Sequence, residues 1–287
     1  MNFQQLKYFR TVYECRNMTR AAERLHVSQP AVSAALKELE AELGAPLFVR
    51  QNRGIVATEE GMVFYGQACR MLAQCDSARQ IVREVTEGKT QIRLGMVPMI
   101  GNVLFPKIYQ KMSGAYPEIS LDILEGNSYE VIKRLEEGQV ELAIVPEGVD
   151  CPGMARREIY RTRIVFAIRA DHPLARSETL DIRQLADVPL AVYRKGYIYS
   201  QNIGRVFEQY GISARVVAQT TSFVTIRTMI DCGAAGGFLA EEICEGECGI
   251  RTFAFPELPP FPIYLFWKQD EYLSGAARKF LKCCREL

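Results

Sequence analysis

The chain has 287 residues, with 35 Lys and Arg against 34 Asp and Glu and a formal net charge of +1 at pH 7. Chains of this length exceed what one hydrophobic core usually serves, so we expect a small domain and a larger one. The near-neutral charge excludes a protein that holds nucleic acid by bulk positive charge. Any DNA-binding site must therefore be a local cluster of basic and polar side chains.

The cysteines and histidines argue against metal chemistry. The nine cysteines are scattered along the chain and odd in number, which is typical of free thiols in a reducing compartment. The two histidines, His26 and His172, lie far apart, so we expect neither a metal site nor a cofactor. The first residues, MNFQQLKYFR, contain no apolar run with a cleavage site, and no stretch is long enough to span a membrane. We expect a cytoplasmic protein without a membrane partner.

The first 58 residues have the spacing of a helix-turn-helix. Asn17 or Thr19 can cap a short helix, and residues 26–27 can form a turn. Ser28 can then cap a second helix, whose first turn tolerates Pro30.

The second helix has one apolar and one polar face. Its apolar positions recur at the spacing of a buried helix face and are Val32, Ala35, Leu36 and Leu39. The outward stripe consists of Gln29, Ser33 and Lys37, with Pro30 beside it. Gln29 and Ser33 carry the paired donors and acceptors that base edges require, whereas Lys37 is better suited to a phosphate. This stripe is the predicted contact with double-stranded DNA, and the simpler alternative for Ser28 and Pro30 is that they only start the helix.

A β-hairpin is predicted after the second helix. Two short β-prone runs, residues 47–50 and 55–57, flank the turn sequence Gln-Asn-Arg-Gly. The hairpin would be a wing that carries Arg50 and Arg53 on the DNA-facing side.

Residues 59–87 form one long helical pattern that Thr58 can cap. Apolar side chains alternate at spacings of four and three over three heptads, which is typical of a self-associating helix. The alternative is a single amphipathic helix that packs on its own domain. The predicted dimer seam consists of Phe64, Ala68, Met71, Cys75, Ala78, Val82 and Val85.

The rest of the chain contains two similar strand-helix-strand-helix-strand units. The first runs from about residue 92 to 145 and the second from about 190 to 240, with glycines where several helices end. Two α/β lobes imply a cleft between them. A strand at 263–267 and a helix at 276–287 are expected to return to the first lobe.

The predicted ligand site lies at the carboxyl ends of the strands, where helix N-termini converge. The residues expected there are Pro98, Met99, Ile100, Ser128, Pro146, Tyr199, Ser200 and Phe223. Pro98 has no backbone N–H to offer a carboxylate, so we expect a small, partly apolar or aromatic ligand with one polar or acidic end. The alternative is that Met99, Ile100 and Phe223 only pack the boundary between the lobes.

These patterns predict an α+β fold in three parts. The parts are a winged helix-turn-helix at 1–58, a linker and dimerisation helix at 59–88, and a two-lobed α/β domain at 89–287. We place the first lobe at about 91–162 and 267–287 and the second lobe at about 163–266.

Several motifs resemble those of the LysR-type transcriptional regulators. In the N-terminal part they are LKYF at 6–9, AAERL at 21–25, VSQPAVS at 27–33 and PLF at 46–48. Weaker matches continue as IRLG at 92–95, LEEG at 135–138 and HPLA at 172–175. The resemblance therefore covers nearly the whole chain.

The resemblance implies a winged helix-turn-helix, a linker helix that pairs two subunits, and a two-lobed domain like periplasmic solute-binding proteins. It also implies control of transcription by a small-molecule effector, an interrupted palindromic operator bound by a dimer or tetramer, and RNA polymerase as a further candidate partner. By position, Gln29, Pro30, Ser33 and Lys37 would address the major groove, and Arg53 the neighbouring minor groove or backbone.

Three other interpretations are an enzyme, a solute-binding protein for transport and a regulator with a thiol switch. We do not expect an enzyme, because no phosphate-binding, zinc-protease or nucleophile-elbow motif occurs in the chain. A solute-binding protein for transport would explain the cleft and not the N-terminal domain. A thiol switch is an alternative signal, since Cys244 and Cys248 lie four residues apart. Peroxide-sensing members of the family, however, carry cysteines in the segment that matches residues 193–204, where this chain has none.

Overall fold

The computed structural model describes residues 1–51, 54–87, 90–194, 196–246, 249–269 and 271–286. The chain divides into two compact units, residues 1–88 with 136–139 and residues 89–135 with 140–287. In these described ranges no helix combines the length and the apolar character that a membrane crossing needs.

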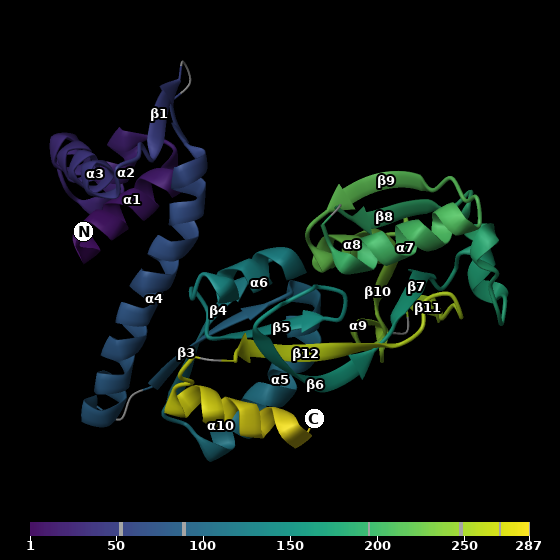
Figure 1. Cartoon of the computed structure of the whole chain (residues 1–287). Helices are drawn as coiled ribbons and strands as arrows, with labels where there is room; N and C mark the ends of the chain where they lie inside the picture. The colour runs from purple at the N-terminus through teal and green to yellow at the C-terminus, as the bar shows by residue number, and fades with distance from the viewer. Residues whose placement is uncertain (52–53, 88–89, 195, 247–248, 270, 287) are drawn as a thin grey trace. The chain divides into compact units, whose positions relative to one another are not determined.

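The first unit consists of helices and one small hairpin (Figure 1). Its elements are α1 (Phe3–Cys15), α2 (Met18–Leu25), α3 (Gln29–Leu43), β1 (Phe48–Gln51), β2 (Gly54–Ala57) and α4 (Glu59–Glu87). Asn17 caps α2 by accepting a hydrogen bond from the amide of Arg20 at 3.0 Å, and Ser28 caps α3 by accepting from the amide of Ala31 at 3.4 Å. The helix-turn-helix therefore forms where the capping residues predict it.

The core of the first unit is aromatic and includes the start of α4. The buried ring of Phe9 lies 5.2 Å from the ring of Phe48 and 5.0 Å from the ring of Phe64, measured between centroids. Tyr13 stacks on Tyr65 with 3.9 Å between ring centroids. Because aromatic contacts bury large areas, the first half of α4 is part of the fold of this unit.

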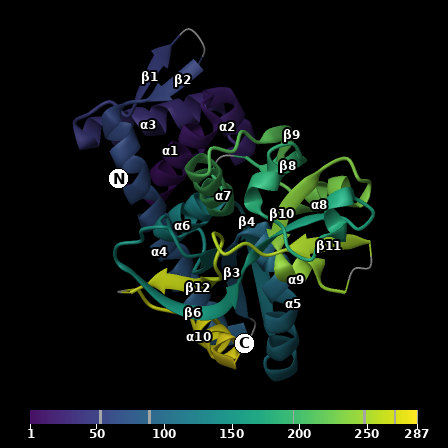
Figure 2. The same cartoon turned by 90° about the vertical axis from the view of Figure 1, so that its right-hand side faces the viewer.

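The second unit contains two five-stranded sheets. The sheet of the first lobe has the strand order β4-β3-β5-β12-β6. β3 pairs in parallel with β4 and β5, whereas β12 pairs antiparallel with β5 and β6. α10 packs against α5 and β3 (Figures 1 and 2). The elements of this lobe are β3 (Thr90–Met96), α5 (Pro98–Ala115), β4 (Ile119–Glu125), α6 (Ser128–Glu136), β5 (Leu142–Pro146), β6 (Met154–Thr162), β12 (Phe261–Lys268), α10 (Gly275–Cys283) and the 3-10 turn η3 (Cys284–Glu286).

The sheet of the second lobe has the strand order β11-β7-β10-β8-β9. β8 pairs in parallel with β9 and β10, and β7 pairs antiparallel with β10 and β11. The elements of this lobe are β7 (Ile164–Arg169), the 3-10 turns η1 (Pro173–Arg176) and η2 (Ile182–Leu185), β8 (Pro189–Tyr193), α7 (Ile198–Gln209), β9 (Arg215–Thr220), α8 (Phe223–Asp231), β10 (Gly236–Ala240), α9 (Glu241–Cys244) and β11 (Ile250–Phe253).

The strand order confirms the predicted internal repeat. In each lobe the three parallel strands are arranged with the first in the middle, as β4-β3-β5 and as β9-β8-β10. Each lobe then adds antiparallel strands beside the third. The fold is therefore the expected α+β chain with a helix-turn-helix and a two-lobed α/β part.

Three strands, β6, β7 and β11, were not predicted from the sequence. The sequence of β6, MARREIYRT, has no clear alternation of apolar and polar residues. Its pairing partner β12 follows only after the whole second lobe. Pairing with a distant strand makes this segment a strand, and local propensity does not reveal such pairing.

The predicted strand at 263–267 does return to the first lobe, but the lobe boundary expected at about 266/267 lies too late. β12 begins at Phe261 and pairs along its length within the sheet of the first lobe, so the chain returns before Phe261. α5 begins at Pro98. Proline fits the first turn of a helix because no backbone N–H is needed there.

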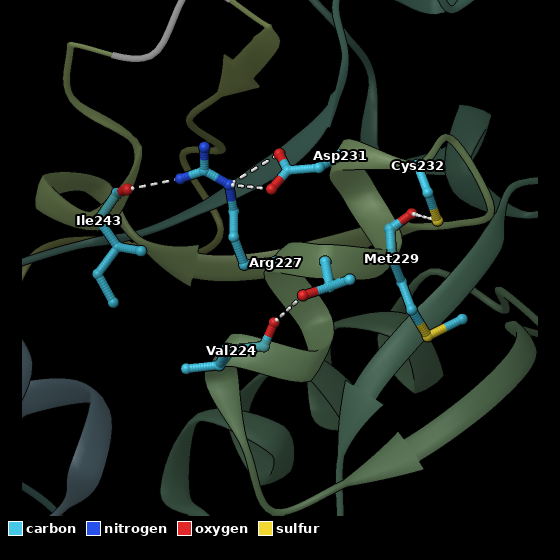
Figure 3. Close-up of polar contacts among 7 residues, drawn as sticks. Val224, Arg227, Met229, Asp231, Cys232 and Ile243 are labelled. Carbon is cyan, nitrogen blue, oxygen red and sulfur yellow. Dashed lines mark hydrogen bonds and ion pairs between the residues drawn. The ribbon is translucent and has the colours of Figure 1, made fainter.

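A polar cluster ties α8 to α9 in the second lobe (Figure 3). The Arg227 guanidinium donates to the Asp231 carboxylate at 2.9 Å and to the carbonyl of Ile243 in α9 at 3.0 Å. With 18% of its side chain exposed, Arg227 is screened from water more than a surface ion pair would be. The position of α8, which begins at Phe223, is thereby fixed in its lobe.

Candidate DNA-binding face and ligand cleft

α3 separates a buried from an accessible face. Its buried side chains are at most 3% exposed and are Val32, Leu36 and Leu39. The residues predicted to contact DNA lie on the accessible side: Pro30 and Lys37 are exposed, as are Ala31, Ala34 and Glu38, whereas Gln29 and Ser33 are half-buried. Since residues four apart lie on one side of a helix, Gln29, Ser33 and Lys37 form a row of the kind that a recognition helix presents to a groove.

The predicted wing is present as the β1–β2 hairpin. The strands pair antiparallel from Phe48 opposite Ala57 to Gln51 opposite Gly54. Arg50 lies in β1 with its backbone opposite Ile55. Arg53 falls outside the described residues.

Glu40 positions the wing and was not predicted from the sequence. Its Oε1 atom accepts hydrogen bonds from the amides of Leu47 at 2.8 Å and Phe48 at 3.2 Å. These charge-assisted bonds connect the helix that carries the accessible row to the first strand of the hairpin. An acidic residue in the interior of a helix gives no local signal for this role, because its partners lie beyond the end of the helix.

Thr58 and Gly61 hold the other end of the hairpin. The Thr58 hydroxyl donates to the carbonyl of Pro46 at 2.7 Å and accepts from the amide of Gly61 at 3.0 Å, which confirms the predicted cap of α4. A Cβ atom added to Gly61 would overlap the carbonyl oxygen of Leu47. Only glycine therefore allows this close approach between α4 and the segment before β1.

The first half of the predicted dimer seam on α4 packs against the core of its own unit. Ala68 is fully buried in the core of its own unit, and Phe64 and Met71 pack against that core. The aromatic contacts with α1 explain this, because they turn this side of the helix inward, as the alternative interpretation expects. Farther along α4, Cys75 is half-buried, and Ala78 and Val82 are exposed. The placement of the Val85 side chain lies outside what the structure describes.

The predicted cleft residues do lie at strand ends and in first helical turns. Met99 and Ile100 belong to the first turn of α5, and Tyr199 and Ser200 to the first turn of α7. The others are Pro98, which starts α5, Ser128, which starts α6, Pro146, which ends β5, and Phe223, which starts α8.

Most of these side chains are closed to solvent. Met99, Ile100 and Ser128 are each 1% exposed, and Tyr199 is 3% exposed. The Ser200 hydroxyl is half-buried and donates to the carbonyl of Tyr193 at 3.0 Å. Met99 and Ile100 are therefore buried as the alternative interpretation expects, in which they pack the boundary between the lobes. The remaining members of the set, Pro98, Pro146 and Phe223, range from half-buried to buried.

The helix N-termini at this edge differ in their capping. Asn127 and Glu130 cap α6 reciprocally, and Ser222 caps α8 by accepting from the amide of Thr225 at 3.4 Å. α7 has no side-chain cap at Tyr197. The first turn of α6 already holds the Glu130 carboxylate. The N-terminus of α7, which no side chain caps, is therefore better placed to bind an anion than that of α6.

Three tyrosines at the end of β8 and the start of α7 form an aromatic cluster. The ring of Tyr193 lies 5.0 Å from that of Tyr197 and 6.4 Å from that of Tyr199, measured between centroids. Burial raises the pKa of all three phenols above the ordinary value of 10.0, so their hydroxyls stay protonated at alkaline as well as neutral pH. Sequence reasoning selected only Tyr199 of the three, because the burial of strand-end residues depends on the opposite lobe.

Polar contacts join the two lobes at this edge. The Tyr193 hydroxyl donates to the Sδ atom of Met99 in the first lobe at 3.4 Å. Tyr129 of α6 and Gln201 of α7 also approach, with 3.5 Å between the Tyr129 hydroxyl and the Gln201 Oε1 atom. A cavity of about 480 Å³ extends along α7 in the second lobe and reaches Tyr193 and Ser200. This volume lies in the range of small-molecule sites.

The described residues include no group of three or more His, Cys, Asp or Glu side chains that could hold a metal. Cys244 is buried at the end of α9, and Cys248 falls outside the described residues. α9 ends at Cys244, and the alternative of a thiol switch stays a hypothesis.

Two family models match the chain. "Bacterial regulatory helix-turn-helix protein, lysR family" matches residues 3–62, and "LysR substrate binding domain" matches residues 86–287. Among curated relatives, the Hca operon transcriptional activator HcaR of Escherichia coli is 25% identical over 100% of this chain and 98% of its own length. The hydrogen peroxide-inducible genes activator of Dickeya chrysanthemi is 26% identical over 100% of this chain and 95% of its own length.

Solved structures show the same fold. A full-length OxyR variant from Pseudomonas aeruginosa has a TM-score of 0.70 at 23% identity, covering 100% of this chain and 98% of that one. CbnR in complex with its target DNA has a TM-score of 0.71 at 22% identity, covering 99% of both chains. With two family models that together span nearly all residues, the chain belongs to the LysR family of DNA-binding transcriptional regulators and carries an effector-binding domain.

Proposed function

We propose that this regulator binds an interrupted palindromic operator as a dimer, or as a dimer of dimers, and that a small molecule in the cleft between the two lobes changes this binding. The observation that carries the proposal is the accessible row Gln29, Ser33 and Lys37 on a helix whose other face is core. Such a regulator acts in the cytoplasm, where the chromosome is, and RNA polymerase is the partner it would meet at a promoter.

Each residue of the DNA-binding face has a role that its chemistry supports. Gln29 and Ser33 offer donors and acceptors to base edges in the major groove, with Pro30 packing beside them. Lys37 neutralises a phosphate, and the wing residues Arg50 and Arg53 bind the neighbouring backbone or minor groove. Glu40 maintains the spacing between the row and the wing.

The dimer contact is proposed on exposed apolar positions of α4. Val63 is 69% exposed and Val82 is 61% exposed, with Ala78 exposed between them. At about 100° per residue these three positions fall within an arc of about 100°. Val63 lies about 140° around the helix from the buried Ala68, and Val82 lies about 40° from it. The proposed face therefore overlaps the predicted seam, keeps Ala78 and Val82, and adds Val63.

The effector is proposed to be small and partly aromatic, with one polar or acidic end. Its apolar part would contact Met99, Ile100 and Phe223, which are apolar and lie at the cleft edge. Its polar end would bind near the N-terminus of α7, where Ser200 and the exposed Arg194 lie. The Ser128 hydroxyl at the start of α6 lies on the opposite lobe.

The operator proposal can be tested by selecting binding sites from a random duplex DNA pool with the full-length protein. The expected result is a motif with two inverted half-sites spaced by about one or two helical turns. A Gln29→Ala, Ser33→Ala double variant should fail to enrich this motif, and Glu178→Ala, at an exposed position of the second unit, serves as the surface control. Enrichment of the same motif by the double variant would contradict the assigned face.

The dimer proposal can be tested by sedimentation equilibrium of Val63→Glu and Val82→Glu variants. Charge placed in an apolar interface is costly, so both variants should shift toward monomer by at least about tenfold in dissociation constant. Met62→Glu is the matched control, because Met62 is 55% exposed on the same helix and lies outside the proposed arc. An unchanged oligomer in both valine variants would exclude this face.

The effector proposal can be tested by a thermal-shift screen of benzoate, salicylate and short dicarboxylates, followed by operator binding with each stabilising compound. A ligand that binds only the folded state raises the melting temperature. The proposal expects at least one such compound to change operator affinity, and Phe223→Ala to reduce its effect. A response that is the same in Phe223→Ala would place the site elsewhere.

A further inference from the structure

The hydrogen bond between Tyr193 and Met99 is unusual in its acceptor. Tyr193 is 4% exposed and Met99 is 1% exposed, and the phenol donates to the thioether sulfur at 3.4 Å. A buried hydroxyl loses its hydrogen bonds to water. The thioether offers only a weak hydrogen bond in exchange, because its sulfur is a weak acceptor. The phenol therefore has a weaker partner here than a carbonyl or carboxylate oxygen would be.

Met99 is suited to move. It lies in the first turn of α5 in the first lobe, and its side chain reaches a residue of the second lobe. Methionine has three flexible bonds and no branch, so it fills gaps between other groups and leaves them at low cost. Its side chain closes the contact between the lobes at the strand ends.

The surroundings of the sulfur fit a planar ligand. The rings of Tyr197 and Tyr199 flank Tyr193 at 5.0 and 6.4 Å between centroids. The Tyr199 hydroxyl is buried and has no hydrogen-bond partner in the described part of the chain. Tyr193 also lines the cavity of about 480 Å³ along α7, whose lining residues all belong to the second lobe and do not include Met99.

We propose that Met99 is a plug of the effector cleft, and that a planar ligand with an oxygen acceptor displaces it and takes over the hydrogen bond from the Tyr193 hydroxyl. This inference rests on the proposed function, because it names how the cleft between the lobes is closed and which chemistry opens it. Tyr193 then selects ligands with a carbonyl or carboxylate oxygen over hydrocarbons of the same shape.

The test uses two probes of nearly equal shape, acetophenone, which has a carbonyl oxygen, and ethylbenzene, which does not. Calorimetric titration is done with the full-length wild-type protein and with Met99→Ala. Removing the plug should make acetophenone bind about tenfold more tightly than it binds to wild type, and more tightly than ethylbenzene binds to the same variant. In Met99→Ala, Tyr193→Phe the preference for acetophenone should disappear.

A second variant guards against loss of folding in Met99→Ala. Met99→Leu keeps the volume and removes the sulfur acceptor, so it should fold like wild type and still bind acetophenone several-fold more tightly. Equal acetophenone affinity in Met99→Ala with and without the Tyr193 hydroxyl would overturn the proposal, as would wild-type affinity in both Met99 variants. These titrations contain no DNA. Failure of the proposed function would appear separately, as an operator affinity that no stabilising compound changes.

Discussion

The row on α3 and the cleft edge of the second unit were both predicted from side-chain chemistry, yet they differ in accessibility. Lys37 is exposed and Ser33 is half-buried, whereas Met99 and Ser128 are each 1% exposed. A DNA groove is a rigid partner that a surface can meet without rearranging. Apolar side chains at a small-molecule site instead pack against one another until a ligand separates them.

The largest expected effect separates the two faces of α3. Leu39→Ala should lower the free energy of unfolding of the first unit by about 2–5 kcal/mol, because Leu39 is fully buried. Lys37→Ala should change it by less than about 0.5 kcal/mol, as expected for a surface side chain. Denaturant unfolding followed by circular dichroism measures both. Similar losses in the two variants would show that the accessible and buried faces are wrongly assigned.

The next effect concerns DNA recognition itself. Ser33→Ala and Gln29→Ala should each weaken binding to the selected operator by about 1–3 kcal/mol and weaken binding to unrelated DNA much less. Lys37→Ala should weaken both to a similar extent and reduce the slope of log affinity against log salt by about 1. Fluorescence anisotropy at several salt concentrations distinguishes the two patterns. If Lys37→Ala alone relaxed sequence preference, the assignment of base and phosphate contacts would be reversed.

A smaller effect tests whether the accessible face depends on its support. Glu40→Ala removes the acceptor of two amide hydrogen bonds and should cost about 1–3 kcal/mol in unfolding free energy. Glu40→Gln is the matched control, since it keeps an oxygen acceptor without the charge, and should lose less. Operator affinity should fall in the same order if the wing contributes to binding. Unchanged stability in Glu40→Ala would remove this residue from the description of the wing.

The smallest effect appears only at alkaline pH and compares the two units. Burial raises the pKa of Cys69 in the first unit from 9.0 to about 11, and that of Cys284 in the second unit to about 12. Because the folded state holds the neutral thiol, this stabilisation is complete below about pH 9 and is lost as the pH rises through these values. Because both thiols have the same ordinary pKa of 9.0, both units should begin to weaken near pH 9, and the second should go on losing stability to higher pH than the first. Cys69→Ala should reduce the loss of its stability between about pH 8 and about pH 10.5, and an unchanged pH profile would assign the loss to other groups.

Much of the DNA-binding unit could be predicted because its signals are local. Asn17, Ser28 and Thr58 bond to amides three residues ahead, so each helix start is readable in the sequence. The buried positions of α3 follow the helical period, as expected for a face that packs on a core. The same reasoning explains why the repeated strand-helix units of the two lobes were recognised.

The seam on α4 shows where a local pattern becomes ambiguous. A heptad pattern is compatible with a second subunit and with the core of the same chain. The Phe9–Phe64 contact, between helices far apart in sequence, decided in favour of the core for the first half. At the exposed positions of the second half, such as Val82, the dimer contact stays a prediction.

The sequence by itself determined the helix caps, the two faces of α3 and the repeated order of strands and helices, since each depends on neighbours within about one helical turn or on simple periodicity. The tertiary structure alone decided that β6 pairs with β12, that Glu40 holds the wing, and that Met99 meets Tyr193. These contacts join residues farther apart than one helical turn, by seven positions for Glu40 and Leu47 and by 94 for Met99 and Tyr193. Their formation depends on packing that no local pattern encodes.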